Sequence, residues 1–365
     1  MPKLFKSAAE IEGSLRAAGV RVADAAALAA KSKPYIRLET VGVDDEAQIA
    51  MGATKIGGTP DLPVTMPWPS RPPYPDHEKR VEEAQASVDL FNPQDMAALQ
   101  AEALEEFRKL LPSGEFEGFA AESAKVDFSK LNLDSLVEDT RRTRMPAPLQ
   151  FIAQVDLADI WATAPVDPDI PREGRLLLFY DTDHRPGGDR PADITGARLI
   201  HDLTPVDSLK RAIPPAELLA RKQTAGFRPQ RCVLHAGLWP PHFGSPEWNA
   251  CEIKAKAEEN VQAWWHEATR DAHDHRFGGH PLQIQGDMQT ECALVNQGLG
   301  LDARNSKAAE RLKSDAANWL MLLQIASDDR AGMMWGDVGN LYVWIHRDAL
   351  RARRFEEARV IMQCY

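Results

Sequence analysis

The spacing of apolar residues changes several times in the first part of the chain, and each change predicts an element. An alanine-rich segment from Ser7 to about Ser32 carries apolar residues at helical spacing and is interrupted at Gly19, which predicts a helical hairpin. Apolar and charged residues then alternate from Pro34 to Val41, as in a strand with one buried face. Prolines and glycines crowd residues 57–75 and exclude a regular helix or a central strand there. We therefore expect the sheet to begin near residue 34.

Helical spacing returns in two further stretches. The charge-rich segment from about residue 77 to residue 144 contains a strong helical pattern at residues 95–107 and a weaker one near residues 131–141. We expect this segment to be an insertion between elements of the sheet. A second long helix is predicted over residues 246–272, because Ser245 suits an N-cap and Pro246 the first helical position.

An internal repeat is the most informative feature of the sequence. Each half contains a Gly-Gly turn, an apolar run with a single glutamine, and a glycine-led apolar run, in the same order. The copies are residues 56–60 and 277–281 for the turn, 149–156 and 319–326 for the glutamine run, and 174–181 and 339–346 for the glycine-led run. This order predicts a β-rich α+β fold of two similar sheet-containing halves about a pseudo-twofold axis.

The same motifs carry a family resemblance. Taken in order, KIGGTPDLP, PLQFIAQVDL, GRLLLFYD, FGGHPLQIQGDMQ, LLQIASDD and MMWGDVGNLYVWI resemble the YwqG-like family of uncharacterised bacterial proteins. The resemblance implies a duplicated α+β domain and no established activity. We accordingly divide the chain into an N-terminal helical region (1–33), a first half (34–200, with the insertion at 77–144) and a second half (201–365). The first region and the insertion exceed what the family core requires.

Composition narrows the classes of function. The 365 residues are 44% apolar and 27% charged, as in globular proteins, and no segment approaches the roughly 20 apolar residues of a membrane span. No signal peptide is recognised, and the four cysteines are scattered, which favours reduced thiols and a cytoplasmic location. A net charge of −11 disfavours nucleic acid as a partner, because binding to phosphates requires clustered Lys and Arg.

The loop before the second glycine-led run suggests a site. Trp335 and Asp337 lie in a Trp-Gly-Asp-Val-Gly element where the first half has an unrelated sequence. Duplicated halves that diverge at one loop often place a ligand there, so both residues are candidates for ligand contact. The alternative is that Asp337 is an ordinary turn residue and that Trp335 caps the core.

Four further polar residues are candidates for ligand binding. Gln154 and Gln324 lie between apolar neighbours, and each buried amide either bonds the backbone of its own half or contacts a ligand. Gln285 and Asp287 alternate like one face of a strand, so they are expected to line a polar groove or a solvated face.

Standard catalytic and metal signatures are missing from the sequence. The histidines, which include His242, His266 and His280, match no metal-binding spacing, and neither a nucleophile elbow, a P-loop nor a dinucleotide motif occurs. We therefore predict no metal and no cofactor, and we assign no catalytic residue.

These observations leave two hypotheses for function. The first is a cytoplasmic binding protein, a monomer or weak dimer, that sequesters a basic protein partner in an immunity-like or antitoxin-like role. The alternative is an enzyme or small-ligand binder that uses a cleft between the halves around Asp337.

Overall fold

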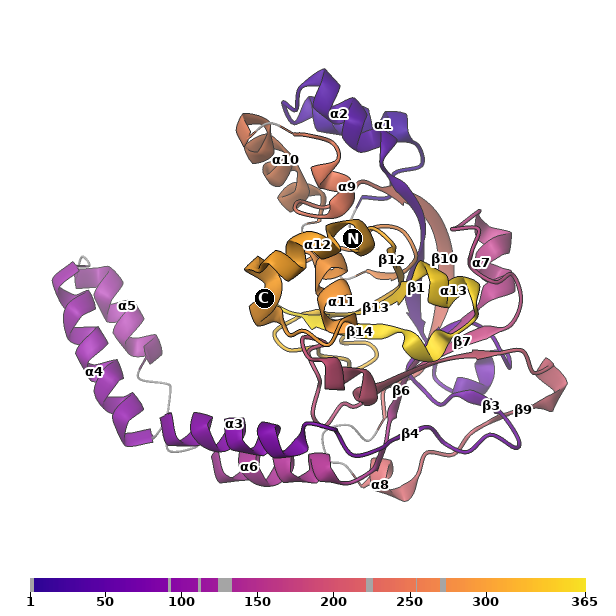
Figure 1. Cartoon of the computed structure of the whole chain (residues 1–365), viewed down its shortest axis with the longest axis horizontal. Helices are drawn as coiled ribbons and strands as arrows, with labels where there is room; N and C mark the ends of the chain where they lie inside the picture. Colours follow the sequence, from indigo (N-terminus) through magenta and orange to yellow (C-terminus); the bar gives the residue numbers. More distant parts are fainter. Residues whose placement is uncertain are drawn as a thin grey trace. The chain divides into compact units, whose positions relative to one another are not determined.

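The computed structural model describes residues 3–90, 93–110, 113–123, 133–220, 226–253, 255–269 and 274–365 (Figure 1). The chain forms two compact units. The sheet unit comprises Met1–Arg71 and Ala147–Tyr365, and the inserted unit comprises Pro72–Pro146.

The sheet unit is built on a ten-stranded antiparallel sheet in the order β14-β13-β12-β11-β1-β10-β2-β6-β7-β8. Its strands are β1 (Lys33–Gly42), β2 (Lys55–Ile56), β6 (Gln150–Asp156), β7 (Arg175–Tyr180), β8 (Ala197–Asp202), β10 (Gln230–Trp239), β11 (His275–Phe277), β12 (Trp319–Ala326), β13 (Asn340–His346) and β14 (Arg359–Gln363). The two longest strands, β1 and β10, pair at its centre from Lys33 opposite Trp239 to Gly42 opposite Gln230. Four strands flank this pair on each side.

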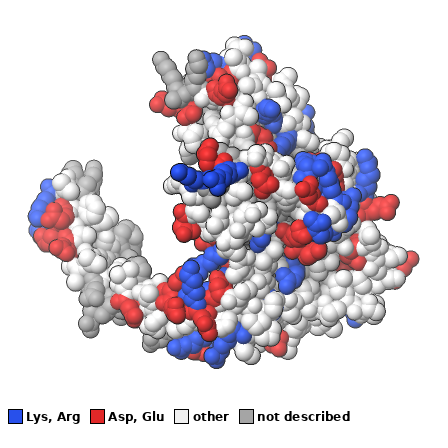
Figure 2. Space-filling model, viewed as in Figure 1, with Lys and Arg blue, Asp and Glu red and all other residues white. Residues whose placement is uncertain are grey.

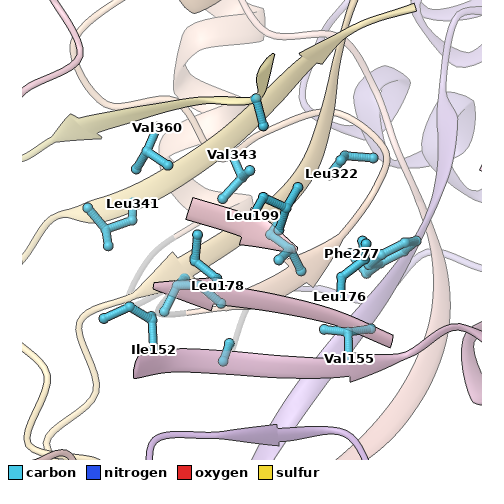
Figure 3. Close-up of a cluster of buried hydrophobic side chains, with 14 of the residues drawn as sticks. Ile152, Val155, Leu176, Leu178, Leu199, Phe277, Leu322, Leu341, Val343 and Val360 are labelled. Atoms are coloured by element: carbon cyan, nitrogen blue, oxygen red, sulfur yellow. The ribbon is translucent and has the colours of Figure 1, made fainter. Parts of the chain in front are cut away.

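The sheet curls around one core. Strands β6 to β8 on one side and β12 to β14 on the other contribute side chains to a single buried cluster, because alternate residues of each strand point to the same face. Figure 3 shows Leu176 and Leu178 from one side of the sheet in the same buried cluster as Val343 and Val360 from the other. At the open edge, the amide of Met362 in β14 donates to the carbonyl of Gly187, 3.0 Å away, in the segment before β8. The sheet is therefore nearly closed.

Two groups of helices cover the sheet unit. In the first, α1 (Ala8–Ala17), α2 (Val22–Ala30), α9 (Pro246–Asn249) and α10 (Ala255–Ala268) lie together and share one apolar cluster with Trp239 of β10 (Figure 1). In the second, α11 (Met288–Asn296) and α12 (Lys307–Ala316) pack on β12, β13 and β14. The remaining helices are α7 (Leu157–Thr163), α8 (Ala216–Leu219) and α13 (Arg347–Arg351).

The predicted helix over residues 246–272 is wrong in its length. Its start is correct, because the Ser245 hydroxyl accepts a hydrogen bond from the amide of Trp248. The helix ends at Asn249, however, and Glu252 adopts φ of +50°, which breaks the helical path before α10 begins at Ala255. Apolar spacing alone gave no sign of this break.

The described part of the inserted unit is helical. Its helices are α3 (His77–Leu90), α4 (Pro93–Leu110), α5 (Ser113–Ser123) and α6 (Leu133–Arg141). Two of them, α4 and α6, match the predicted patterns at residues 95–107 and 131–141. Helix α3 packs on α6, and α4 meets α5 with the rings of Phe107 and Phe119 4.9 Å apart. The chain leaves the sheet unit after β4 (Ser70–Arg71) and returns at β5 (Ala147–Pro148), and these two strands pair with Arg71 opposite Ala147. The ends of the insertion are therefore adjacent in space.

The expected fold class is confirmed as α+β with a large antiparallel sheet. A second two-stranded sheet pairs β3 (Asp61–Pro63) with β9 (Leu209–Arg211). Among the described residues, no helix combines the length and the apolar character that a membrane span requires.

Candidate functional site

A cavity of about 260 Å³ lies beside the start of β12. Its walls come from residues 319–322 of β12, Trp344 of β13, the turn at residues 278–281, and the loop at residues 166–170 between α7 and β7. Lys33, Pro34 and Gln289 complete it. We call it the tryptophan cavity, after Trp319 and Trp344.

The Gly-Gly turn shapes one wall of the tryptophan cavity. Gly278 and Gly279 have φ of +69° and +74°, a region that residues with a Cβ atom rarely adopt. A Cβ atom on Gly278 would meet no atom closer than the Pro34 carbonyl oxygen at 3.9 Å, so space is open beside this glycine. The amide of Gly278 donates to the carbonyl of Leu322, which fixes the turn on β12.

Two tryptophans supply buried hydrogen-bond donors in the cavity wall. Trp319 and Trp344 are 1% and 3% exposed, and they lie on neighbouring strands, with Trp344 opposite Met321. Neither indole Nε1 hydrogen has an acceptor among the described residues. A buried donor without an acceptor costs about 1–3 kcal/mol, so these two indoles are a local cost to stability.

His280 adds a neutral imidazole to the wall. Its Nε2 lies 2.9 Å from the carbonyl oxygen of Lys31, which can only accept, so Nε2 carries the hydrogen and Nδ1 is an acceptor. Burial, together with the nearby Lys33 ammonium, lowers the pKa of His280 to about 3. Lys33 itself forms an ion pair with Glu247, and its charge holds the pKa of Glu247 below the ordinary value although burial acts to raise it.

An ion-pair network holds the loop that covers the cavity. Asp167 receives two hydrogen bonds from the guanidinium of Arg347, at 3.0 Å and 3.2 Å. Asp169 bonds Arg347 and also Arg351, whose Nε lies 3.0 Å from Oδ2. Burial alone would raise the pKa of Asp169, but these hydrogen bonds outweigh it and keep the pKa low. The loop is thus fixed to the chain just after β13.

The two candidate glutamines lie far apart in the sheet order, and each bonds the backbone of its own half. Gln154 accepts from the amide of Asp61 and donates to the carbonyl of Ala53. Gln324 accepts from the amide of Leu282 and donates to the carbonyl of Asp274. Both side chains are fully buried. A direct ligand contact by either amide stays a prediction.

Trp335 and Asp337 have different surroundings. Trp335 is buried, donates from Nε1 to the carbonyl of Ala326, and packs at right angles on Tyr180. Asp337 is exposed in a turn with Gly336 at φ of +56°, and its carbonyl accepts from the amide of Tyr365. The structure therefore does not bring these two side chains together, and their role in ligand binding stays a prediction.

Gln285 and Asp287 are not on a strand, so the expected strand face is wrong. Asp287 is the N-cap of α11 and accepts from the amides of Gln289 and Thr290. Burial raises the pKa of Asp287 although these bonds act against it. Gln285 is exposed and donates to the carbonyl of Cys364. The alternation in the sequence came from a loop followed by a helix start.

The sequence contained one overlooked signal for the tryptophan cavity. When the repeated runs are aligned, Trp319 corresponds to Leu149 and Trp344 corresponds to Phe179. Only the runs in the second half have an indole N–H at these two positions, so the two sets of runs differ there. Among the described residues, no group of three or more His, Cys, Asp or Glu side chains is placed to hold a metal ion.

The fold and cavity define an α+β protein with a curled antiparallel sheet and a small, mostly apolar cavity. The family model described as Domain of unknown function (DUF1963) matches residues 54–364, and the chain belongs to that family. Comparison with curated proteins gives no match.

Proposed function

We propose that this protein binds a small, mostly apolar molecule with one hydrogen-bond acceptor in the tryptophan cavity. The observation that carries the proposal is that Trp319 and Trp344 both line the cavity, and that their buried indole donors have no acceptor in the described part of the chain. The cavity volume of about 260 Å³ is just below the range of drug-sized ligand sites, about 300–1,000 Å³, so the ligand has the size of a single ring.

We also infer that the sheet arose by duplication, because hydrogen bonds recur at matching positions. Four bonds of the first half have a counterpart in the second. In the first half they run from Gly57 N to Ile152 O, from Asp61 N to Gln154 Oε1, from Gln154 Nε2 to Ala53 O, and from Asp156 N to Thr54 Oγ1. Their counterparts, in the same order, run from Gly278 N to Leu322 O, from Leu282 N to Gln324 Oε1, from Gln324 Nε2 to Asp274 O, and from Ala326 N to His275 Nδ1. The pairing of β6 with β7 and that of β12 with β13 also shift register at matching points.

Comparison of the two Gly-Gly turns supports a ligand in the second half. At Gly57 an added Cβ atom would lie 2.5 Å from the Arg228 carbonyl oxygen and 3.1 Å from the Phe227 Cβ. Phe227 also packs on the ring of Trp335, with centroids 5.7 Å apart. Protein atoms therefore fill the space beside the first turn, whereas the space beside Gly278 is open. A ligand in the second half takes the place that Phe227 and its neighbours occupy in the first.

Two probe molecules of nearly equal shape test the proposal. Acetophenone carries a carbonyl oxygen where ethylbenzene has a methylene group, so their difference isolates the acceptor. We expect acetophenone to bind about 2- to 10-fold more tightly, since a net hydrogen bond contributes about 0.5–1.5 kcal/mol. Isothermal titration calorimetry or equilibrium dialysis measures both affinities.

Substitutions of the two tryptophans test whether their indole groups cause the preference for acetophenone over ethylbenzene. The double variant Trp319→Phe, Trp344→Phe keeps two rings and removes both N–H groups, so the preference for acetophenone is expected to disappear. Trp68→Phe is the matched control, because Trp68 lies outside the cavity and donates to the carbonyl of Leu149. The proposal is wrong if neither probe binds, or if the double variant keeps the preference.

The other sequence-based expectations stay predictions. A basic protein partner would need an acidic surface, but on the face that Figure 2 shows, Lys and Arg lie among Asp and Glu. This mixture gives less support to sequestration of a basic protein than to a small ligand. The cytoplasmic location and the narrower YwqG-like assignment are likewise proposals that rest on the sequence alone.

A further inference from the structure

A second pocket lies elsewhere in the sheet unit and shares no lining residue with the tryptophan cavity. Its volume is about 290 Å³. Its lining residues include His242 and Phe243 after β10, Gln262, Trp265 and His266 of α10, and Tyr365. We call it the histidine pocket.

The side chains that line the histidine pocket indicate an uncharged ligand. Among the described residues that line it, none is Lys, Arg, Asp or Glu. Burial lowers the pKa of His242, and the nearby His266 lowers it further, so His242 is neutral at neutral pH. An ionic ligand would lose hydration here without gaining a side chain of opposite charge, which makes its binding unfavourable.

The polar groups of the pocket offer both donors and acceptors. His242 Nδ1 lies 3.1 Å from the carbonyl oxygen of Phe243 and must donate to it, which leaves Nε2 as an acceptor. The amide nitrogen of Asn340 donates to the Tyr342 hydroxyl, and its side-chain oxygen accepts no hydrogen bond from the residues that the structure describes. Gln262 and His266 are exposed on α10, and neither makes a hydrogen bond to the part of the chain that the structure describes. Hydroxyl groups, which both donate and accept, pair with all of these.

Aromatic rings line the same space. Phe243 is 40% exposed and Tyr365 is 79% exposed, so two large rings remain in contact with water at the pocket. Trp265 is buried, and its ring lies 4.8 Å from the ring of His242. The C–H groups of a saturated ring pack well on aromatic faces, and their contact removes apolar surface from water.

We propose that the histidine pocket binds an uncharged, hydroxyl-rich molecule of the size of one sugar ring. Neutral imidazole and amide groups bond its hydroxyls, and the rings of Phe243, Trp265 and Tyr365 cover its C–H face. This ligand class differs from the apolar, single-acceptor molecule proposed for the tryptophan cavity. The two proposals are therefore independent, and each can be refuted without affecting the other.

A panel of named probes tests the second proposal. Saturation-transfer difference NMR is recorded on the full chain with glucose, galactose, mannose and N-acetylglucosamine. Choline and adenine serve as alternatives, because aromatic pockets also bind quaternary ammonium groups and flat bases. We expect at least one sugar to bind, and the double variant Gln262→Ala, His266→Ala to weaken that binding at least fivefold.

Two controls keep the result interpretable. Glu259→Ala changes another exposed residue of α10 that does not line the pocket, so it is expected to retain sugar binding. The variant Trp319→Phe, Trp344→Phe is expected to retain it as well. The proposal is overturned if no sugar binds, if choline or adenine binds in place of the sugars, or if the α10 double variant binds sugar as the natural chain does.

Discussion

The two buried glutamines allow a quantitative test of the sheet. Gln324→Leu keeps the side-chain volume close to that of Gln but removes both polar ends of the amide. The amide of Leu282, 2.8 Å from Oε1, then loses its acceptor, and the carbonyl of Asp274, 2.9 Å from Nε2, loses its donor. Both groups are buried, and each one left unpaired costs about 1–3 kcal/mol. The expected loss of unfolding free energy is therefore about 2–6 kcal/mol.

Gln154→Leu should cost at least as much. It leaves the amide of Asp61 and the carbonyl of Ala53 unpaired, and it also removes a hydrogen bond of 3.0 Å to the Asp61 carboxylate. Hydrogen bonds to charged groups contribute about 1.5–3 kcal/mol, more than bonds between neutral groups. Similar losses at both positions would support the inference that the two halves are copies.

Urea unfolding followed by tryptophan fluorescence is the suitable assay. All nine tryptophans lie outside residues 72–146, so the signal reports on the sheet unit alone. Gln285→Leu is the matched control, because this exposed glutamine donates to the carbonyl of Cys364 and its loss should cost less than about 1 kcal/mol. The reasoning is refuted if Gln324→Leu and Gln154→Leu cost no more than the control.

Two other predictions concern the first half and the insertion. Asp61→Asn is expected to destabilise the sheet unit by about 1.5–3 kcal/mol at pH 7, because the fully buried Lys55 loses one charged partner while Glu46, also 3.1 Å away, still pairs with it. Burial acts to raise the pKa of Asp61, but Lys55 and the bond from Gln154 outweigh it and lower the pKa. The ionised Asp61 carboxylate therefore stabilises the folded chain at pH values above its unfolded pKa, and this stabilisation is lost as the pH falls toward its folded pKa. Urea titrations should show that the difference in unfolding free energy between Asp61→Asn and the natural chain becomes smaller below about pH 5. Replacing residues 77–144 with a Gly-Ser linker is expected to leave the urea midpoint detected by fluorescence nearly unchanged, because the paired strands β4 and β5 already hold the two ends of the insertion together. A shortened chain that fails to fold contradicts this prediction.

Local patterns in the sequence predicted much of the fold. Alternation indicated β1, and the glycine-led runs indicated β7 and β13. The serine N-cap at residue 245 and two helices of the insertion, α4 and α6, were also predicted correctly, whereas α3 and α5 were not predicted. These features depend on neighbours within a few residues, so the sequence of each segment contains the information. The internal repeat also related positions far apart in the sequence, because it aligned Gln154 with Gln324 in two similar apolar runs.

The tertiary structure alone decided where a ligand can fit. Pairing of β1 with β10 across about 200 residues sets the sheet order, and the register of β12 with β13 places Trp344 near Trp319. Whether space beside a Gly-Gly turn is filled depends on distant atoms, such as those of Phe227 at the first turn. No local pattern encodes such contacts, because a cavity is defined by the packing of segments far apart in the chain.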